Sequence, residues 1–351
     1  MAKKQTDPAL WLPLYTLATA ARELASWQWM YEDEIFGLRL PGDTLTWYAS
    51  IMGSGGEHFT YCFYRGDAAL ADFLRLRQLS KSSHGLLSPF SLLSMQNCLQ
   101  VAFENRENVP DEQKERLKAL GLRFRGAHQW ITVTDYKAGL YPWPVDAAQA
   151  LPLRQLLQQA MVVTAHKREK PRWFGSWNKA GQIMPIFQAI DKGDTLFWEE
   201  SRMAIDPGPA RHSAASGAAA TFPAEWNAVR RKPAENARLA IGELFVPNPV
   251  QEHKNQRPYF PTIFLMIDLN SGMVVGMMSQ KAEDHKALEL SLLKVFQTWE
   301  ARPSEIQLAD AALIDVFEPF FNLAGIQLRV TNEAAKQTQA INQQLQMTGL
   351  R

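Results

Sequence analysis

The segment 238–344 decides the fold of the C-terminal third of this chain. It contains RLAIGELFVPN at 238–248, PTIFLMIDLNSGMVVGMMSQ at 261–280, EIQLAD at 305–310 and IQLRVT at 326–331. Apolar and β-branched residues dominate these stretches, and helix-length segments separate the last three. Asn270-Ser271-Gly272 divides the second stretch into two strands, because glycine tolerates the positive φ of a tight turn.

The pattern predicts the element order β-β-β-α-β-α-β-α. Strands are expected at 238–246, 262–269, 273–278, 305–309 and 326–330. Helices are expected at 284–301, 312–323 and from 332 to about 346. A meander followed by helix-separated strands predicts an α/β domain, in which helices cover the faces of a mixed five-stranded sheet.

This order resembles the RNase H-like fold, and more narrowly the catalytic core of retroviral integrases and transposases. The words that carry the resemblance are IDLNSG at 267–272, ARPSEIQLAD at 301–310 and LAGIQLRV at 323–330. It covers residues 238–345. Enzymes of that family hold two Mg²⁺ or Mn²⁺ ions with acidic side chains, and the ions stabilise the attacking and leaving oxygens of phosphoryl transfer.

The resemblance places the first acid on or beside Glu243, where the family usually has Asp. The second falls on Asp310, which Ala311-Ala312 follow where the family commonly has Asn-Gly. The third has no counterpart, since Glu333 stands at the start of the last helix, and Asp268 begins a hairpin turn, where Asp is common. Two carboxylates would fix and neutralise two metal ions poorly. A degenerate site is expected, with no catalytic residue and no bound metal.

Residues 1–168 are expected to form a separate α+β domain. Strand-like runs at 34–40, 45–52 and 58–64 are separated by glycine-rich turns, which predicts an antiparallel meander covered by helices. The glycines at 53–56 are expected to form a turn, since no Lys-Ser/Thr pair follows them as in a phosphate-binding loop. Aromatic residues of this region either line a ligand groove or cover a half-buried sheet face. They are Trp27, Trp29, Trp47, Tyr48, Phe59 and Tyr61.

This domain also resembles the N-terminal domain of an uncharacterised bacterial family of two-domain proteins. The matching words are WQWM at 27–30, DEIFGL at 33–38, YASIMGSGGEHF at 48–59, ENRENV at 104–109, LGLRFRG at 120–126 and YPWP at 141–144. The resemblance covers most of residues 10–165. It implies a family without an activity to carry over.

Between the domains, a β-hairpin extension is expected at 169–205 and a flexible linker at 206–234, followed by the C-terminal domain at 235–351. The linker prediction rests on PGPARHSAASGAAATFP, a stretch of small residues, Pro and Gly. Two basic clusters flank this region, and such clusters either contact nucleic-acid phosphates or remain solvated. They consist of Lys167, Arg168, Lys170 and Arg172, and of Arg230, Arg231 and Lys232.

Composition narrows the class of protein. The chain has 351 residues, 46% of them hydrophobic and 21% charged, which is typical of globular proteins. From residue 239 onward there are nine Lys/Arg against twelve Asp/Glu, which disfavours a tight nonspecific grip on DNA. Cys62 and Cys98 are expected to be free thiols in a reducing compartment. With no signal-peptide pattern and no long apolar run, a cytoplasmic protein without a membrane partner is expected.

The sequence therefore predicts a non-catalytic binding or scaffolding protein with a degenerate integrase-core-like domain. Its partner would be a protein or a nucleic acid, and no cofactor is expected. The alternative is a nuclease or transposase-like enzyme that depends on Mg²⁺ or Mn²⁺. Its ligands would be Glu243 and Asp310, with Asp268 or Glu333 completing the site.

Overall fold

The structure is a computed structural model. It describes residues 6–82, 96–171, 183–192, 196–204, 219–246, 248–254, 256–280, 284–310 and 312–347. Within these ranges the chain forms two compact units. The first contains residues 6–82, 96–137 and 142–204, and the second contains residues 138–141 and 219–347. Both combine helices with a mixed sheet, so the protein is α+β overall.

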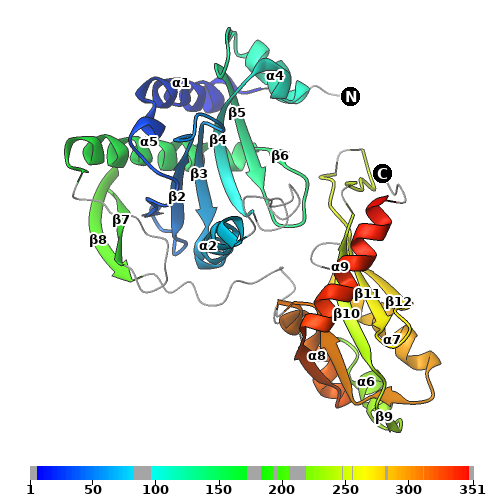
Figure 1. Ribbon diagram of the computed structural model, residues 1–351. Coiled ribbons are helices and arrows are strands. Elements are labelled where there is room, and N and C mark those ends of the chain that lie inside the picture. The colour runs from blue at the N-terminus through cyan, green and yellow to red at the C-terminus, as the bar shows by residue number, and fades with distance from the viewer. Residues whose placement is uncertain are drawn as a thin grey trace. The chain divides into compact units, whose positions relative to one another are not determined.

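The first unit is built on an eight-stranded sheet of order β6-β5-β4-β3-β2-β1-β7-β8 (Figure 1). Its strands are β1 (Phe36–Arg39), β2 (Trp47–Met52), β3 (Thr60–Arg65), β4 (Cys98–Glu104), β5 (Trp130–Tyr136), β6 (Trp143–Pro144), β7 (Ile183–Asp191) and β8 (Leu196–Ala204). Its helices are α1 (Pro8–Leu24), α2 (Gly66–Ser82), α4 (Asp111–Ala119) and α5 (Ala147–Glu169), with short 3₁₀ turns at Ser26–Gln28 and Arg106–Asn108. Every neighbouring pair is antiparallel except β1 and β7, which are parallel. The hairpin β7–β8 therefore belongs to the main sheet.

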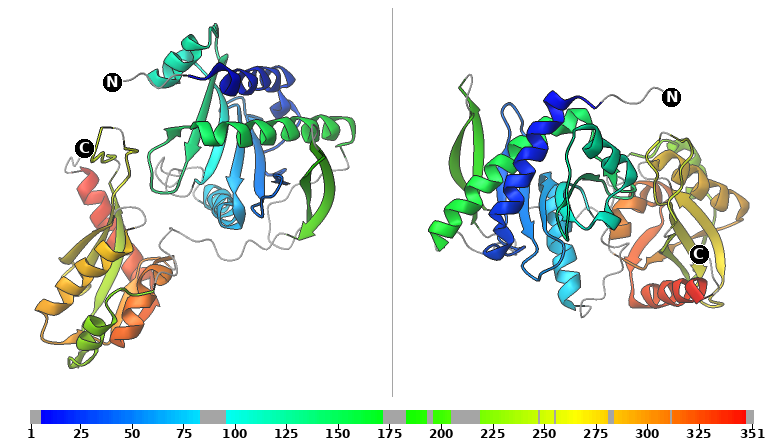
Figure 2. Two further views of the ribbon diagram at one scale, coloured as in Figure 1. Left: turned by 180° about the vertical axis from the view of Figure 1, so that it is seen from behind. Right: turned by 90° about the horizontal axis from the view of Figure 1, so that it is seen from above.

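Helices cover both faces of this sheet. Helices α1 and α5 lie side by side across one face (Figure 2), and α2 packs on the other. Because successive strand residues point to opposite faces, Tyr61 and Phe63 of β3 enter the α1/α5 core, while Cys62 and Tyr64 enter the α2 core. Burial of these two apolar layers is the main source of the unit's stability.

The aromatic residues of the N-terminal half belong to these cores. Trp47, Tyr48 and Tyr61 are buried, and Trp27 packs against Phe59 with ring centroids 5.0 Å apart. This packing supports the sheet-face interpretation of the aromatic cluster rather than an open ligand groove.

The second unit contains a five-stranded sheet of order β12-β11-β10-β14-β15. Its strands are β10 (Leu239–Phe245), β11 (Thr262–Asp268), β12 (Val274–Gln280), β14 (Glu305–Leu308) and β15 (Gln327–Val330), and the short strands β9 (Ala234–Glu235) and β13 (Arg302–Pro303) form a separate parallel pair. Its helices are α6 (Pro223–Arg230), α7 (His285–Thr298), α8 (Ala312–Ala324) and α9 (Asn332–Met347). Only β11 runs opposite to the other strands of the five-stranded sheet. Helix α9 covers one face, and α6, α7 and α8 form a core on the other.

The second unit begins before residue 235, the boundary expected from sequence. Helix α6 buries Trp226 completely, and its indole N–H donates to the buried carboxylate of Glu289 on α7 (2.9 Å). The same carboxylate accepts backbone N–H groups of Thr221 (2.7 Å) and Phe222 (2.9 Å). Three charge-assisted hydrogen bonds tie this segment to the core. The part of the predicted linker at 219–234 is therefore packed structure, and the part at 206–218 lies outside the described residues.

Helix α9 approaches the sheet most closely over Gly242, in the middle of β10. A Cβ atom at Gly242 would lie 2.7 Å from Cβ of Thr338, whose hydroxyl donates to the Ala334 carbonyl inside α9 (2.8 Å). Real Cβ atoms essentially never come so near to one another. The absence of a side chain at residue 242 is what lets the helix settle on the strand.

We expect Gly242→Ala to lower the free energy of unfolding by about 2 kcal/mol, because overpacking forces the helix and the strand apart. Gly55→Ala is the matched control, since a Cβ there meets nothing within 4 Å. Urea unfolding of both variants and the wild type measures the difference. Equal stability of the two variants would contradict the close approach.

Candidate functional site

Glu243 and Asp310 lie at the same end of two neighbouring parallel strands. Strand β10 pairs with β14 so that Ile241 stands opposite Leu308, and the Ala309 N–H donates to the Ile241 carbonyl (3.0 Å). Continuing this register by two residues places Glu243 beside Asp310. Both residues are exposed. The structure thus brings together the two residues, Glu243 and Asp310, that the resemblance assigns as the first and second acids.

The Glu243 carboxyl holds its proton more tightly than an ordinary glutamate. Desolvation by the surrounding protein, and secondly the charge of Asp310, raise its pKa from 4.5 to about 7. Glu243 remains exposed as a residue, so the desolvation is partial. Two carboxylates that face each other resist double ionisation unless a cation neutralises them.

Asp268 and Glu333 lie at the opposite end of β10. Asp268 stands opposite Leu239, the first residue of that strand, and its Oδ1 accepts the backbone N–H groups of Asn270 (2.7 Å) and Ser271 (3.2 Å). The Asp268 carboxylate therefore stabilises the β11–β12 turn, a common role for Asp.

Glu333 is bound in an ion pair beside that turn. Both of its carboxylate oxygens accept from Nη2 of Arg238, each at 2.7 Å, and Arg238 immediately precedes β10. Because a strand rises about 3.3 Å per residue, the backbones of Arg238 and Glu243 are about 16 Å apart. The four candidate acids form two separate pairs. Among the described residues no group of three or more His, Cys, Asp or Glu side chains is placed to hold a metal ion.

At the Glu243 end, helix α9 contributes an amide. The Asn342 side chain donates to the backbone carbonyl of Glu243 (3.2 Å). Its own Oδ1 is buried and accepts no hydrogen bond from the described part of the chain. Asn342 was not among the residues predicted from the sequence. Its position on the expected last helix could have indicated it. Asn342 follows Glu333 by nine residues, or two and a half helical turns, which carries the helix towards the Glu243 end of β10.

Two residues of the first basic cluster, Lys167 and Arg168, make contacts within the first unit. Lys167 is buried and forms an ion pair with Glu34, and its ammonium donates to the Trp29 carbonyl (3.3 Å). The guanidinium of Arg168 lies over the Trp29 ring, 4.7 Å from the centroid. Lys170 ends α5 and is exposed. Arg172 lies outside the described residues.

In the second cluster, Lys232 closes the end of helix α7. Its ammonium donates to the carbonyls of Phe296 (2.8 Å), Gln297 (3.3 Å) and Trp299 (2.5 Å). Carbonyls at a helix C-terminus lack intrahelical partners, so a lysine there satisfies and neutralises them. Arg230 and Arg231 are exposed. The structure therefore gives Lys167 and Lys232 structural roles.

We expect Lys232→Met to lower the free energy of unfolding by about 1 kcal/mol or more, because three carbonyls lose their donor. Arg231→Met, one residue earlier and exposed, is expected to change stability by less than about 0.5 kcal/mol. Thermal unfolding of both variants measures the effect. Equal melting temperatures would contradict the capping role of Lys232.

The raised pKa of Glu243 predicts a stability that depends on pH. Between the unfolded value of 4.5 and the folded value of about 7, the folded state keeps a proton that the unfolded state has released, so stability falls as pH rises. Glu243→Gln cannot ionise. As pH rises from 4 to 8, the free energy of unfolding of this variant should increase by about 1 kcal/mol relative to that of the wild type. This figure is reduced for solvent screening at an exposed residue.

The partner variant tests the cause of this shift. Asp310→Asn removes the neighbouring charge and should lessen the pH dependence without abolishing it, since desolvation remains. Denaturant unfolding at both pH values gives the comparison. If the free energies of unfolding of Glu243→Gln and the wild type differ by the same amount at pH 4 and pH 8, the raised pKa of Glu243 is contradicted.

The described helices include none with the length and apolar character that a membrane span requires.

Comparison with known proteins also divides the chain into two parts, although the first match ends within β7. Residues 11–184 match a domain of unknown function (DUF7309), and residues 225–343 match another domain of unknown function (DUF6930). No curated protein and no solved structure matches the chain. The chain is therefore similar, in order, to two domain families of unknown function, which supports a two-domain family without an assigned activity.

Proposed function

We propose that the second unit is an RNase H-like domain whose acidic site no longer supports two-metal catalysis, and that it binds a protein or nucleic-acid partner. The observation that carries the proposal is the division of the four candidate acids between the two ends of β10. Glu243 and Asp310 lie at one end, while Asp268 and Glu333 are engaged at the other. The cytoplasm is the proposed compartment, supported by the buried free thiols Cys62 and Cys98.

The sheet topology supports the RNase H-like part of the proposal. Numbered along the chain, the strands of the second unit lie in the order 3-2-1-4-5, and only the second is antiparallel to the rest. Two acids at the carboxyl ends of the first and fourth strands occupy the positions that the resemblance assigns to catalytic carboxylates. The strand order and the position of these acids agree with a common ancestry.

The side chains present do not fit a two-metal site. Two divalent ions need several carboxylate oxygens within about 2.0–2.6 Å of each metal. Glu333 already neutralises Arg238, whose backbone is about 16 Å along β10 from that of Glu243. Helix α9 offers the neutral Asn342 where an acid would be required. A single Glu–Asp pair remains, and one of its members has a pKa of about 7.

Asp310 also has a structural explanation. It precedes helix α8, and its backbone carbonyl accepts the N–H of Leu313 (3.1 Å). Asp is favoured at such helix starts, where its charge complements the helix dipole. Its presence therefore does not require a metal or a catalytic role.

The alternative function is a nuclease or transposase-like enzyme that depends on Mg²⁺ or Mn²⁺. One observation favours it: Glu243 and Asp310 lie side by side, and the charge of Asp310 acts on Glu243. A cation between them would relieve this repulsion. The two functions predict different responses to Mn²⁺.

We expect the full chain to show no saturable binding of two Mn²⁺ ions by isothermal titration calorimetry. We also expect no cleavage of single- or double-stranded DNA or RNA above the level of Asp310→Asn in Mn²⁺ or Mg²⁺. The titration and the cleavage assay use the same preparation of each protein. A circular dichroism spectrum of that preparation shows whether the protein is folded. Cleavage by wild type that Asp310→Asn and Glu243→Gln each abolish would establish the enzyme instead.

A further inference from the structure

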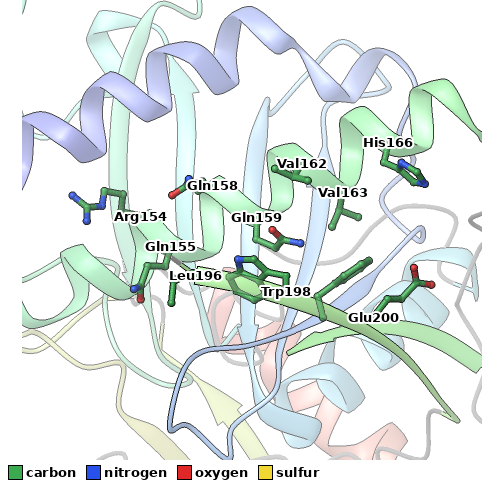
Figure 3. A pocket seen from close by; sticks show the side chains of 11 residues that line it. Arg154, Gln155, Gln158, Gln159, Val162, Val163, His166, Leu196, Trp198 and Glu200 are labelled. Atoms are coloured by element: carbon green, nitrogen blue, oxygen red, sulfur yellow. The ribbon is translucent and has the colours of Figure 1, made fainter. Parts of the chain in front are cut away.

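The first unit carries a groove between helix α5 and the hairpin β7–β8, with a volume of about 780 Å³. One face of α5 forms a wall, and residues of β7 and β8 form the other (Figure 3). The α5 residues follow helical spacing: Arg154, Gln155, Gln158, Gln159, Val162, Val163 and His166. The strand residues are Phe187, Leu196, Trp198 and Glu200.

The groove runs along helix α5. From Arg154 to His166 the helix rises about 18 Å, and from Leu196 to Glu200 the strand extends about 13 Å. Figure 3 shows Arg154 and Leu196 at one end, Trp198 beneath the middle of the helix, and His166 towards the other end. An extended peptide of four or five residues has about this length.

A buried amide faces this groove without a partner. Gln159 is 6% exposed, and among the described residues nothing donates to or accepts from its side chain. The Gln159 amide atoms are not among the enclosed side-chain atoms that lack a partner, so they remain accessible from the groove. Its donor and acceptor together match the C=O and N–H of a peptide group. A bound backbone would satisfy both.

The groove also borders an open sheet edge. Strand β8 ends the eight-stranded sheet and pairs with β7 on one side, with no other described strand against it. Such an edge has unpaired backbone groups, and extended peptides bind by adding to it. The Trp198 indole and the side chain of Leu196 give an apolar surface for one peptide side chain.

Charge distinguishes the two ends of the groove. Arg154 makes no ion pair with any described side chain, so it can receive a carboxylate. Glu200 lies on β8 at the other end, where it already pairs with Arg202 (3.5 Å). Because side chains that face one way alternate along an extended chain, an acidic and an apolar residue at alternate positions would complement the groove.

We propose that this groove binds an extended peptide segment of a partner protein, with an acidic side chain at Arg154 and an apolar one against Trp198. The peptide backbone pairs with the Gln159 amide. This site belongs to the first unit, so it does not depend on the function proposed for the second.

The test is selection from a phage-displayed library of random peptides of about eight residues, longer in extended form than the groove. The full-length wild-type protein is the bait. Enriched peptides are then synthesised with a fluorescent label, and their affinity is measured by anisotropy. We expect enriched sequences with acidic and apolar residues at alternate positions and micromolar dissociation constants.

Two exposed apolar residues of α5 give a matched pair of variants. Val162→Arg blocks the groove and should weaken binding at least about tenfold, whereas Leu151→Arg, outside the groove, should leave it unchanged. Gln159→Met removes the amide and keeps the shape. It should weaken binding and leave the melting temperature of the free protein unchanged, because the Gln159 amide makes no hydrogen bond there. A purely structural glutamine would not give this combination.

Two results would overturn the proposal. One is a selection that enriches no sequence. The other is a set of peptides that bind Val162→Arg as tightly as Leu151→Arg. Circular dichroism of both variants excludes unfolding as the cause of any loss.

Discussion

The rise of an extended strand limits what the acidic residues of the second unit can do together. Strand β10 is the central strand of its sheet, and it separates the level of Arg238 from that of Glu243 by about 16 Å. No carboxylate side chain bridges that distance. The register of β10 with β11 and β14 then decides which acids meet: Asp310 joins Glu243, and Asp268 stays with the turn. Whether the unit can hold two metals follows from this geometry.

Packing on both sides of β10 keeps that register in place. Gly242 lets α9 lie directly on the strand, while Ile241 enters the core formed with α7 and α8 on the other face. Glu289 extends the same core to α6 through its hydrogen bond to Trp226. Because side chains alternate between the two faces of a strand, sliding β10 by one residue would reverse the direction of every side chain and expose its buried groups. The separation of the acids is therefore a stable property of the fold.

Local sequence patterns predicted much of this architecture and little of the chemistry. The strands expected at 238–246 and 262–269 are close to β10 and β11, because apolar runs bounded by turn residues specify strands locally. The parallel pairing of β1 with β7 joins residues about 150 positions apart and leaves no local signal. Only Trp226 and Val229 of α6 are buried, so composition favoured a linker there. The ion pair of Glu333 with Arg238 and the unpaired amide of Gln159 arise only from tertiary contacts.

The most direct test of the account is a crystal of the full-length protein soaked in Mn²⁺ and measured at the manganese absorption edge. The account predicts no anomalous peak shared by Glu243, Asp310 and a residue of α9, and an intact pair between Arg238 and Glu333. Two peaks about 3.5–4 Å apart between Glu243 and Asp310, the spacing of two-metal catalytic sites, would contradict it.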